Sequence, residues 1–322
     1  MQRSPIPIIK HVSPFLEYCE IEKGLSPVST RNYDNFLKVF TGWLTAKNLS
    51  MLKPHELTAD HIWNYRLFLS RKKDPRGAYI KKSTQNYYLI ALRNILNYFA
   101  NKDITALPAE KIKLPKLTDG DKTIKFLRVE QIEKLMAMPN IATAQGMRDR
   151  AILEVLFSTG IRVAELTSLN IESFDVKNIV RGTTKEYELS ITGKGGRTRP
   201  IYFSSRALHS LGTYMKTRKD LFPPLFINYR PDKEDKEHRL TPRSVERMVR
   251  RFTVMAGLPV AATPHTMRHS FATDLLNQGA DMRAVQELLG HKNIMTTQVY
   301  THLTNPKLRE VHRKFHSVGN VK

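Results

Sequence analysis

The first hundred residues repeat apolar positions at the spacing of an α-helix. Ser29 and Thr30 stand where the N-cap of the first long helix is expected, and a shorter helix is expected from Thr58 to Ser70. The apolar faces should pack together as the core of a helical bundle. One face comprises Tyr33, Phe36, Leu37, Phe40, Trp43 and Leu44, and a second comprises Leu89, Leu92, Leu96 and Phe99.

The pattern changes in the second part of the chain. Helices are expected near Arg128–Ala137 and Met147–Ser158, and three short β-branched and aromatic runs that are typical of strands follow them. A glycine-rich segment, residues 193–196, is the expected turn between the last two strands, and helices return from Ser204 onwards. The sequence therefore predicts a mainly α fold with a small antiparallel β-sheet, in the α+β class. The expected strands are Ile179–Thr183, Tyr187–Thr192 and Thr198–Phe203.

Between these two regions, residues 105–125 contain two prolines and a glycine and show little apolar periodicity. Such a composition is typical of a domain boundary. We therefore expect a helical N-terminal domain over residues 1–104, a linker over residues 105–125, and a second domain over residues 126–322.

The net charge of +22 is spread along the chain. Residues 1–117 carry 19 basic and 9 acidic residues, and the remaining residues carry 33 and 21. Two basic domains suggest a protein that embraces a polyanion from both sides. Charge alone leaves DNA, ribosomal RNA and anionic lipid open as partners. No apolar run approaches the length of a membrane span, and the single cysteine, Cys19, favours a reducing cytoplasm.

Two segments carry residues suited to phosphate chemistry. In the first, Gly160 is expected to end one helix, and Arg162 and Glu165 lie three residues apart on one face of the next. An ordinary helical ion pair without a catalytic role would show the same spacing. In the second, Thr263 and Pro264 open a helix whose first turn presents a histidine and an arginine, residues 265 and 268. A helix N-terminus with these side chains makes a phosphate cradle. A zinc site at residues 265 and 269 is disfavoured because an arginine lies beside it and no carboxylate completes it.

A third segment places His291 after a Leu-Leu-Gly run and Tyr300 nine residues later. Taken together, the three segments resemble the tyrosine recombinase, or phage integrase, family. The local sequence around Tyr300 looks most like that of the Xer site-specific recombinases. The resemblance covers roughly residues 125–317, and the first domain also looks like the family's SAM-like core-binding domain. The family's catalytic set falls, in the family's order, on Arg162, Lys194, His265, Arg268, His291 and Tyr300.

The resemblance implies a two-domain, C-shaped DNA clamp that cuts and rejoins double-stranded DNA at an inverted-repeat site. It implies a 3′-phosphotyrosyl intermediate, a Holliday junction and a homo-tetramer on two duplexes, with or without a second recombinase. The expected location is the nucleoid. In this family a C-terminal segment, here residues 306–317, docks into a neighbouring protomer, although packing on its own domain remains an alternative.

The chemistry of strand cleavage explains these residue types. Tyr300 is the expected nucleophile and His265 its base, while Lys194, rather than the nearby Lys185, protonates the departing 5′ oxygen. Two arginines, residues 162 and 268, neutralise the non-bridging oxygens, His291 donates a further hydrogen bond, and Glu165 orients the first arginine. Because the arginine side chains supply the positive charge that a metal ion would otherwise supply, we expect no metal. Because the phosphotyrosyl bond stores the energy of the broken phosphodiester bond, we expect no ATP and no other cofactor.

Several functions stay open at this stage. A type IB topoisomerase shares the chemistry, and a non-catalytic DNA-binding regulator shares the basic surface. Within the recombinases, Xer-like resolution of chromosome or plasmid dimers competes with the integration or excision of a mobile element. The expected helical domain leaves no room for an additional arm-binding domain before residue 11, which favours the simple Xer-like architecture.

Overall fold

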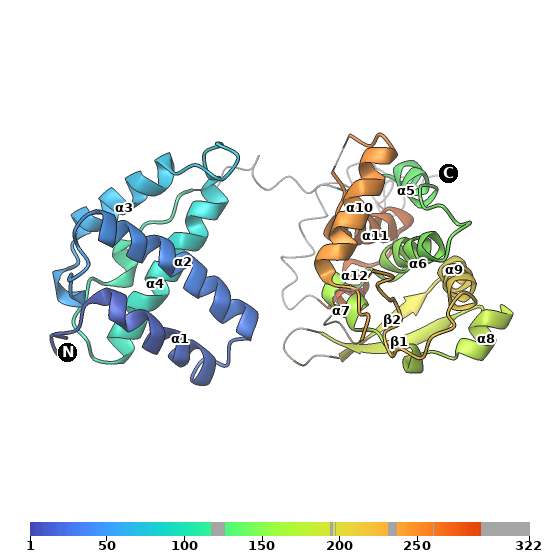
Figure 1. Ribbon diagram of the computed structural model, residues 1–322, viewed down its shortest axis with the longest axis horizontal. Helices are drawn as coiled ribbons and strands as arrows, with labels where there is room; N and C mark the ends of the chain where they lie inside the picture. Colours follow the sequence, from blue (N-terminus) through green and yellow to red (C-terminus); the bar gives the residue numbers. More distant parts are fainter. Residues whose placement is uncertain (117–125, 194–195, 197, 231–236, 260, 291–322) are drawn as a thin grey trace, which may run out of the picture. The chain divides into compact units, whose positions relative to one another are not determined.

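The computed structural model describes residues 1–116, 126–193, 196, 198–230, 237–259 and 261–290. The chain divides into two compact units, Met1–Thr123 and Ile124–Lys322, which Figure 1 shows with the sequence coloured from blue to red. The described residues are mainly helical and contain a two-stranded antiparallel sheet. The predicted fold class is therefore confirmed.

The first unit is a helical bundle in which two twenty-residue helices, α2 and α4, pack against each other (Figure 1). Both predicted apolar stripes face its core, where rings such as Phe40 and Tyr65 meet edge to face with centroids 4.9 Å apart. The core also buries Ala109 and Ile112, which lie within the segment expected to be a linker. The helices are α1 (Val12–Ile21), α2 (Pro27–Ala46), α3 (Ala59–Arg71) and α4 (Lys82–Asn101).

The expected start of α2 is wrong by one turn. Ser26 is the N-cap, and its side chain accepts a hydrogen bond from the backbone N–H of Ser29. Pro27 occupies the first helical position, where the absence of an N–H costs nothing and the ring fixes φ. Ser29 and Thr30 therefore lie inside the first turn. The predicted helix over Thr58–Ser70 is confirmed as α3, with Thr58 as its cap.

The second unit surrounds α6, a helix that is buried along most of its length. This burial explains why α6 lacks a clear polar face: α9, α11, α5 and β2 all pack against it. The two helices expected at the start of this unit are confirmed. Its helices are α5 (Val129–Met136), α6 (Ala144–Thr159), α7 (Val163–Ser168), α8 (Val176–Arg181), α9 (Ser205–Met215), α10 (Pro242–Met255), α11 (Pro264–Gln278) and α12 (Met282–Leu289).

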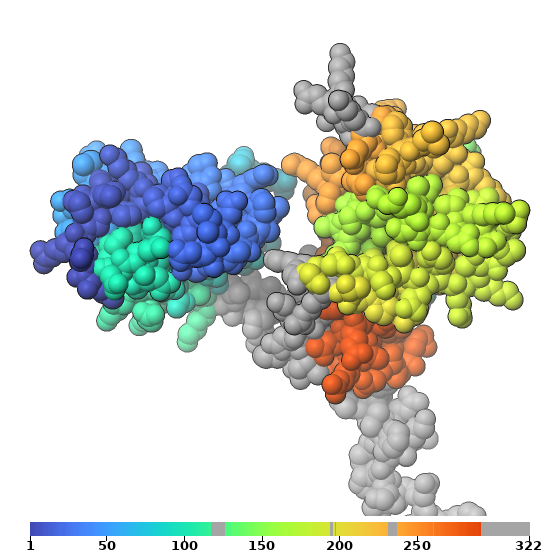
Figure 2. Space-filling model, turned by 90° about the horizontal axis from the view of Figure 1, so that it is seen from below, coloured from blue at the N-terminus to red at the C-terminus, as the bar shows by residue number. Residues whose placement is uncertain are grey.

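The sheet of the second unit is a hairpin of β1 (Tyr187–Thr192) and β2 (Thr198–Phe203), as predicted. Thr192 pairs with Thr198 at the turn end, and alternate residues of β2 point into the core. Strand β2 lies against α12, and Figure 2 shows the side chains of α12 (red) beside those of the hairpin (yellow) on one face of this unit.

The third expected strand, Ile179–Thr183, is wrong because these residues belong to the end of a helix. The β-branched Ile179 and Val180 favour a strand, but local capping decides the structure. Asp175 caps the helix by accepting from the N–H of Asn178, and Gly182, in the left-handed conformation with φ 75°, ends it.

Among the described residues, no helix combines the length and the apolar character needed to cross a membrane.

Candidate active site

The turn between α6 and α7 presents Arg162. Helix α6 ends at Gly160, which adopts a left-handed conformation with φ 58°, and Arg162 is the N-cap of α7. The carboxylate of Glu165 accepts from both the backbone N–H and Nη1 of Arg162, each at 3.0 Å. The predicted pairing of these two residues is therefore present, and one carboxylate fixes Arg162 at its backbone and at its guanidinium.

Arg268 lies in the first turns of α11. As predicted, Thr263 caps this helix by accepting from the N–H of Thr266 at 3.1 Å, and Pro264 takes the first helical position. The side chain of Arg268 is buried, and its Nη1 donates to the backbone oxygen of Gly160 at 2.5 Å. Its Nη2 donates to the backbone oxygen of Leu289.

The two arginines meet at the C-terminal end of α12. Nη2 of Arg162 donates to the oxygen of Gly290 at 3.3 Å, next to the Leu289 oxygen that Arg268 contacts. Unpaired carbonyls at a helix C-terminus carry partial negative charge, so they attract and align guanidinium groups. Each guanidinium has five N–H donors, and so it can hold a carbonyl and still offer donors to a phosphate.

His265 stands one turn before Arg268 on α11. Desolvation by the surrounding protein lowers the pKa of His265, and the positive charges of Arg268 and Arg162 lower it further. The ring is therefore kept neutral at neutral pH, as a proton acceptor must be. Its Nε2 lies 2.8 Å from Nε2 of His269. In the part of the chain that the structure describes, no three His, Cys, Asp or Glu residues cluster as a metal site would require.

Sequence reasoning missed Arg199, which is buried on the inner face of β2. Its Nη1 and Nη2 donate to the two oxygens of Glu165 at 3.1 and 2.7 Å, and its Nε donates to the oxygen of Leu288 at 3.1 Å. Burial alone would raise the pKa of Glu165, but the hydrogen bonds from Arg199 and Arg162 and the charge of Arg199 outweigh it, so the pKa of this carboxyl is lowered and it is ionised. The signal was the alternation of the predicted strand, which places residue 199 on the same face as Ile201 and Phe203.

Lys194, His291 and Tyr300 lie outside the described residues, as does the predicted segment at residues 306–317. The described residues that immediately precede Lys194 and His291 lie close to arginine side chains of the site. Gly193 precedes Lys194, and a Cβ at that position would be 2.9 Å from Oε1 of Glu165. Gly290 precedes His291 and accepts from Arg162.

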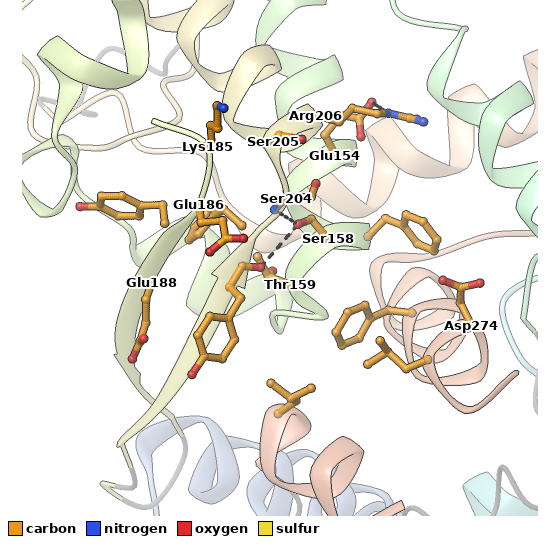
Figure 3. A pocket seen from close by; sticks show the side chains of 17 residues that line it. Glu154, Ser158, Thr159, Lys185, Glu186, Glu188, Ser204, Ser205, Arg206 and Asp274 are labelled. Carbon is orange, nitrogen blue, oxygen red and sulfur yellow. Dashed lines mark hydrogen bonds and ion pairs between the residues drawn. The ribbon is translucent and has the colours of Figure 1, made fainter. Parts of the chain in front are cut away.

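A groove of about 820 Å³ lies beside the hairpin in the described part of the second unit (Figure 3). Its lining does not include the arginine cluster, which consists of Arg162, Arg199 and Arg268. Figure 3 shows the labelled acidic side chains lining it: Glu154, Glu186, Glu188 and Asp274. Lys185, the competing lysine, also lines this groove. With four acidic and two basic side chains, the groove does not suit a phosphate backbone.

Two protein-family models match this chain. Residues 125–306 match the phage integrase family, and residues 12–102 match the phage integrase N-terminal SAM-like domain. The tyrosine recombinase XerC of Pelobacter propionicus is 35% identical over 314 residues, which cover 96% of each chain. The tyrosine recombinase XerD of Pseudomonas putida is 32% identical over 324 residues, covering 98% of this chain and 100% of the relative.

Solved structures share the fold. The XerH site-specific recombinase bound to its difH substrate has a TM-score of 0.66 at 22% identity, covering 93% of this chain and 83% of that one. The Tn1549 transposon integrase in complex with transposon right-end DNA has a TM-score of 0.70 at 18% identity, covering 95% and 99%. The chain therefore belongs to the phage integrase family and is a tyrosine recombinase, a DNA strand-transferring enzyme similar to the Xer recombinases.

Proposed function

We propose that this recombinase cuts and rejoins DNA at a specific site through a 3′-phosphotyrosyl bond at Tyr300. The phenolic oxygen attacks the scissile phosphorus and its proton passes to His265. The bond to the 5′ oxygen breaks, and Lys194 gives that oxygen a proton. Reversal of these steps with a second strand rejoins the DNA, so neither ATP nor another energy source is consumed.

The convergence of Arg162 and Arg268 on adjacent carbonyls carries this proposal. It brings two positive charges from distant parts of the chain to one place, with His265 close enough to respond to both. In a desolvated site two such charges stabilise the extra negative charge of a pentavalent phosphorus. The expected transition-state partners are the two non-bridging oxygens, with His291 as a further donor. Because these charges are supplied by the chain itself, we expect cleavage to proceed in the presence of a chelator.

The first unit is proposed to be the core-binding domain and the second the catalytic domain, and both are proposed to contact the DNA. Both carry excess positive charge, +10 over residues 1–117 and +12 over the remainder. Phosphate contacts from both would position the duplex without reading its sequence. Four protomers on two inverted-repeat sites would then exchange strands through a Holliday junction, alone or with a second recombinase, in the cytoplasm at the nucleoid.

The proposed cellular role is Xer-like resolution of chromosome or plasmid dimers. The observation that favours it is the similarity to XerC and XerD proteins over nearly the whole chain. The second candidate is the integration or excision of a mobile element, and the observation that favours it is the fold shared with the Tn1549 transposon integrase. Deleting the gene separates them: dimer resolution predicts filamentous cells with unsegregated chromosomes, and a mobile-element role predicts normal division.

Covalent capture tests the chemistry. The protein is mixed, in chelator, with nicked duplexes carrying randomised inverted repeats, denatured, and recovered with any attached DNA. Wild type should retain DNA through a 3′ phosphotyrosine, and Tyr300→Phe should bind but retain none. A regulator would retain none in either case. Relaxation of any supercoiled plasmid, without a preferred site, would instead indicate a type IB topoisomerase.

A further inference from the structure

Three consecutive backbone oxygens at the end of α12 each accept a hydrogen bond from a different arginine. These arginines come from the α6–α7 turn, the hairpin and α11, which are far apart in the sequence. One helix end thus gathers three side chains immediately before residue 291. The pairs are Arg199 Nε with Leu288, Arg268 Nη2 with Leu289, and Arg162 Nη2 with Gly290.

Glu165 joins two of these arginines. Its Oε1 accepts from Nη1 of Arg199 and Nη1 of Arg162, and its Oε2 accepts from Nη2 of Arg199 and the backbone N–H of Arg162. Four donors therefore occupy the carboxylate. The side chains of Arg199 and Glu165 are only 8% and 9% exposed, whereas that of Arg162 is 37% exposed. Arg199 is the buried counter-charge, and Arg162 is the accessible one.

Two glycines lie close to these side chains, Gly193 beside both Glu165 and Arg199, and Gly290 beside Arg199. A Cβ at Gly193 would lie 2.9 Å from Oε1 of Glu165 and 3.2 Å from Nη1 of Arg199. A Cβ at Gly290 would lie 2.9 Å from Cδ of Arg199. The residues that follow these glycines in the sequence are Lys194 and His291. Arg199 thus lies close to the residue that immediately precedes each of these two proposed catalytic residues.

We propose that Arg199 is a positioning residue for strand cleavage. It neutralises and orients Glu165, so that Arg162 is held in place while its charge remains available to the scissile phosphate, and it ties the end of α12 to the hairpin. Without Arg199, the buried carboxylate would have Arg162 as its remaining partner and would compete with the phosphate for that guanidinium. The inference rests on the proposed cleavage function.

The test compares Arg199→Met with a matched control, Arg148→Met. Arg148 is also buried, donates two N–H groups to a carboxylate oxygen of Asp149 at 3.0 and 2.5 Å, and donates a third to the oxygen of Ile227 at 2.7 Å. It is not among the residues that contact the arginine cluster. Thermal unfolding and DNA binding are measured for both variants. Arg199→Lys, which keeps the charge without the fork of donors, serves if the methionine variant does not fold.

The readout is the rate of covalent adduct formation on the captured inverted-repeat duplex, made with either an ordinary phosphate or a methylphosphonate at the scissile position. The methyl group replaces one non-bridging oxygen and its charge, so cleavage depends less on Arg162. Arg199→Met should cleave the phosphate about 10- to 100-fold more slowly than wild type and show a much smaller deficit on the methylphosphonate. Any loss in Arg148→Met should be equal on both substrates.

A second variant adds an independent readout. Glu165→Gln in the Arg199→Met background removes the negative charge that would compete with the phosphate for Arg162, and it should recover part of the cleavage rate on the phosphate substrate. The inference is overturned if Arg199→Met cleaves the phosphate as fast as wild type, or if its loss is equal on both substrates and Glu165→Gln restores nothing. If wild type itself forms no adduct in the same assay, the proposed function fails first.

Discussion

Nε2 of His265 lies 2.8 Å from Nε2 of His269, one turn further along α11. A hydrogen bond between two such atoms requires one ring to donate a proton and the other to accept it, so the pair cannot be fully protonated. The lowered pKa of His265 acts in the same direction, since burial and the charges of Arg268 and Arg162 all oppose a second proton. The hydrogen bond requires at least one of the two rings to be neutral, and the lowered pKa of His265 favours the neutral form of that ring, which can accept a proton.

We expect cleavage to resist acid. Because the pKa of His265 lies below its ordinary value of 6.5, the neutral ring should persist as the pH falls past that value, and the cleavage rate should drop only at lower pH. Single-turnover adduct formation across pH measures this, with His265→Gln as the comparison. A fall centred at or above the ordinary value would contradict the assignment.

Acid should lower the stability of the protein over a pH range in which cleavage still proceeds. The unfolded chain binds a proton at residue 265 before the folded chain does, so the free energy of unfolding should decrease as the pH falls from 6.5 towards the lowered pKa. His265→Gln should lose less stability than wild type over that interval. Urea unfolding at several pH values checks this, and equal losses in both proteins would rule it out.

Gly160 is required for two separate reasons. Its φ of 58° disfavours a side chain by about 1–2 kcal/mol, and a Cβ would lie 2.4 Å from Cδ1 of Phe271. Gly182 offers a matched control, since its φ is 75° but nothing lies within 4 Å of a Cβ there. Gly160→Ala should therefore lower the free energy of unfolding by clearly more than Gly182→Ala. It should also slow cleavage, because the Gly160 oxygen holds Arg268.

Chemical denaturation and adduct formation measure the two effects. Equal destabilisation by the two alanines would mean that the backbone conformation alone matters and that Phe271 moves aside at little cost. Unchanged cleavage by folded Gly160→Ala would mean that the carbonyl contact does not set the position of Arg268.

The local features of this fold were readable from the sequence. Thr263 followed by Pro264 predicts the start of α11, Gly160 predicts the end of α6, and the alternation of Thr198–Phe203 predicts β2. In each case neighbouring residues determine the structure. The strand expected at Ile179 was wrong because β-branching favours a strand only weakly, and the helix caps at Asp175 and Gly182 outweigh it.

The arrangement of the site was less accessible. The pairing of Arg162 with Glu165 follows from helical spacing, but the contact between Arg162 and Gly290 spans 128 residues and depends on how α12 packs. The same holds for Arg199, whose charge suggests a surface residue. A buried arginine becomes reasonable only when its carboxylate and carbonyl partners are known.

Arg268→Lys should separate charge from geometry. Lysine keeps the positive charge but cannot donate to Gly160, Leu289 and a phosphate in one plane. We expect cleavage to slow by about 10²- to 10³-fold, the loss typical of a removed transition-state donor, with DNA affinity retained.

Arg218, whose side chain is only 4% exposed, provides the control for that substitution. Arg218 donates to Asp220 and to the oxygens of Phe222 and Leu225, away from the arginine cluster. Arg218→Lys should reduce stability and leave the activity of the folded protein unchanged. Both variants are compared by adduct formation and by fluorescence anisotropy on the same duplex. Wild-type cleavage by Arg268→Lys would exclude a bidentate role.

DNA binding should be strongly sensitive to salt. Each phosphate contact contributes a slope of about −0.9 to the logarithm of affinity against the logarithm of salt concentration. Lys81 and Lys82 are exposed at the start of α4 and are candidate contacts. Replacing both with glutamine should reduce the magnitude of the slope by up to about 1.8. Lys102→Gln is the control, because Lys102 is paired with Glu22 at 2.7 Å. Equilibrium binding at several salt concentrations decides: an unchanged slope would place the phosphate contacts elsewhere, and a flat response in wild type would contradict a clamp that encloses DNA.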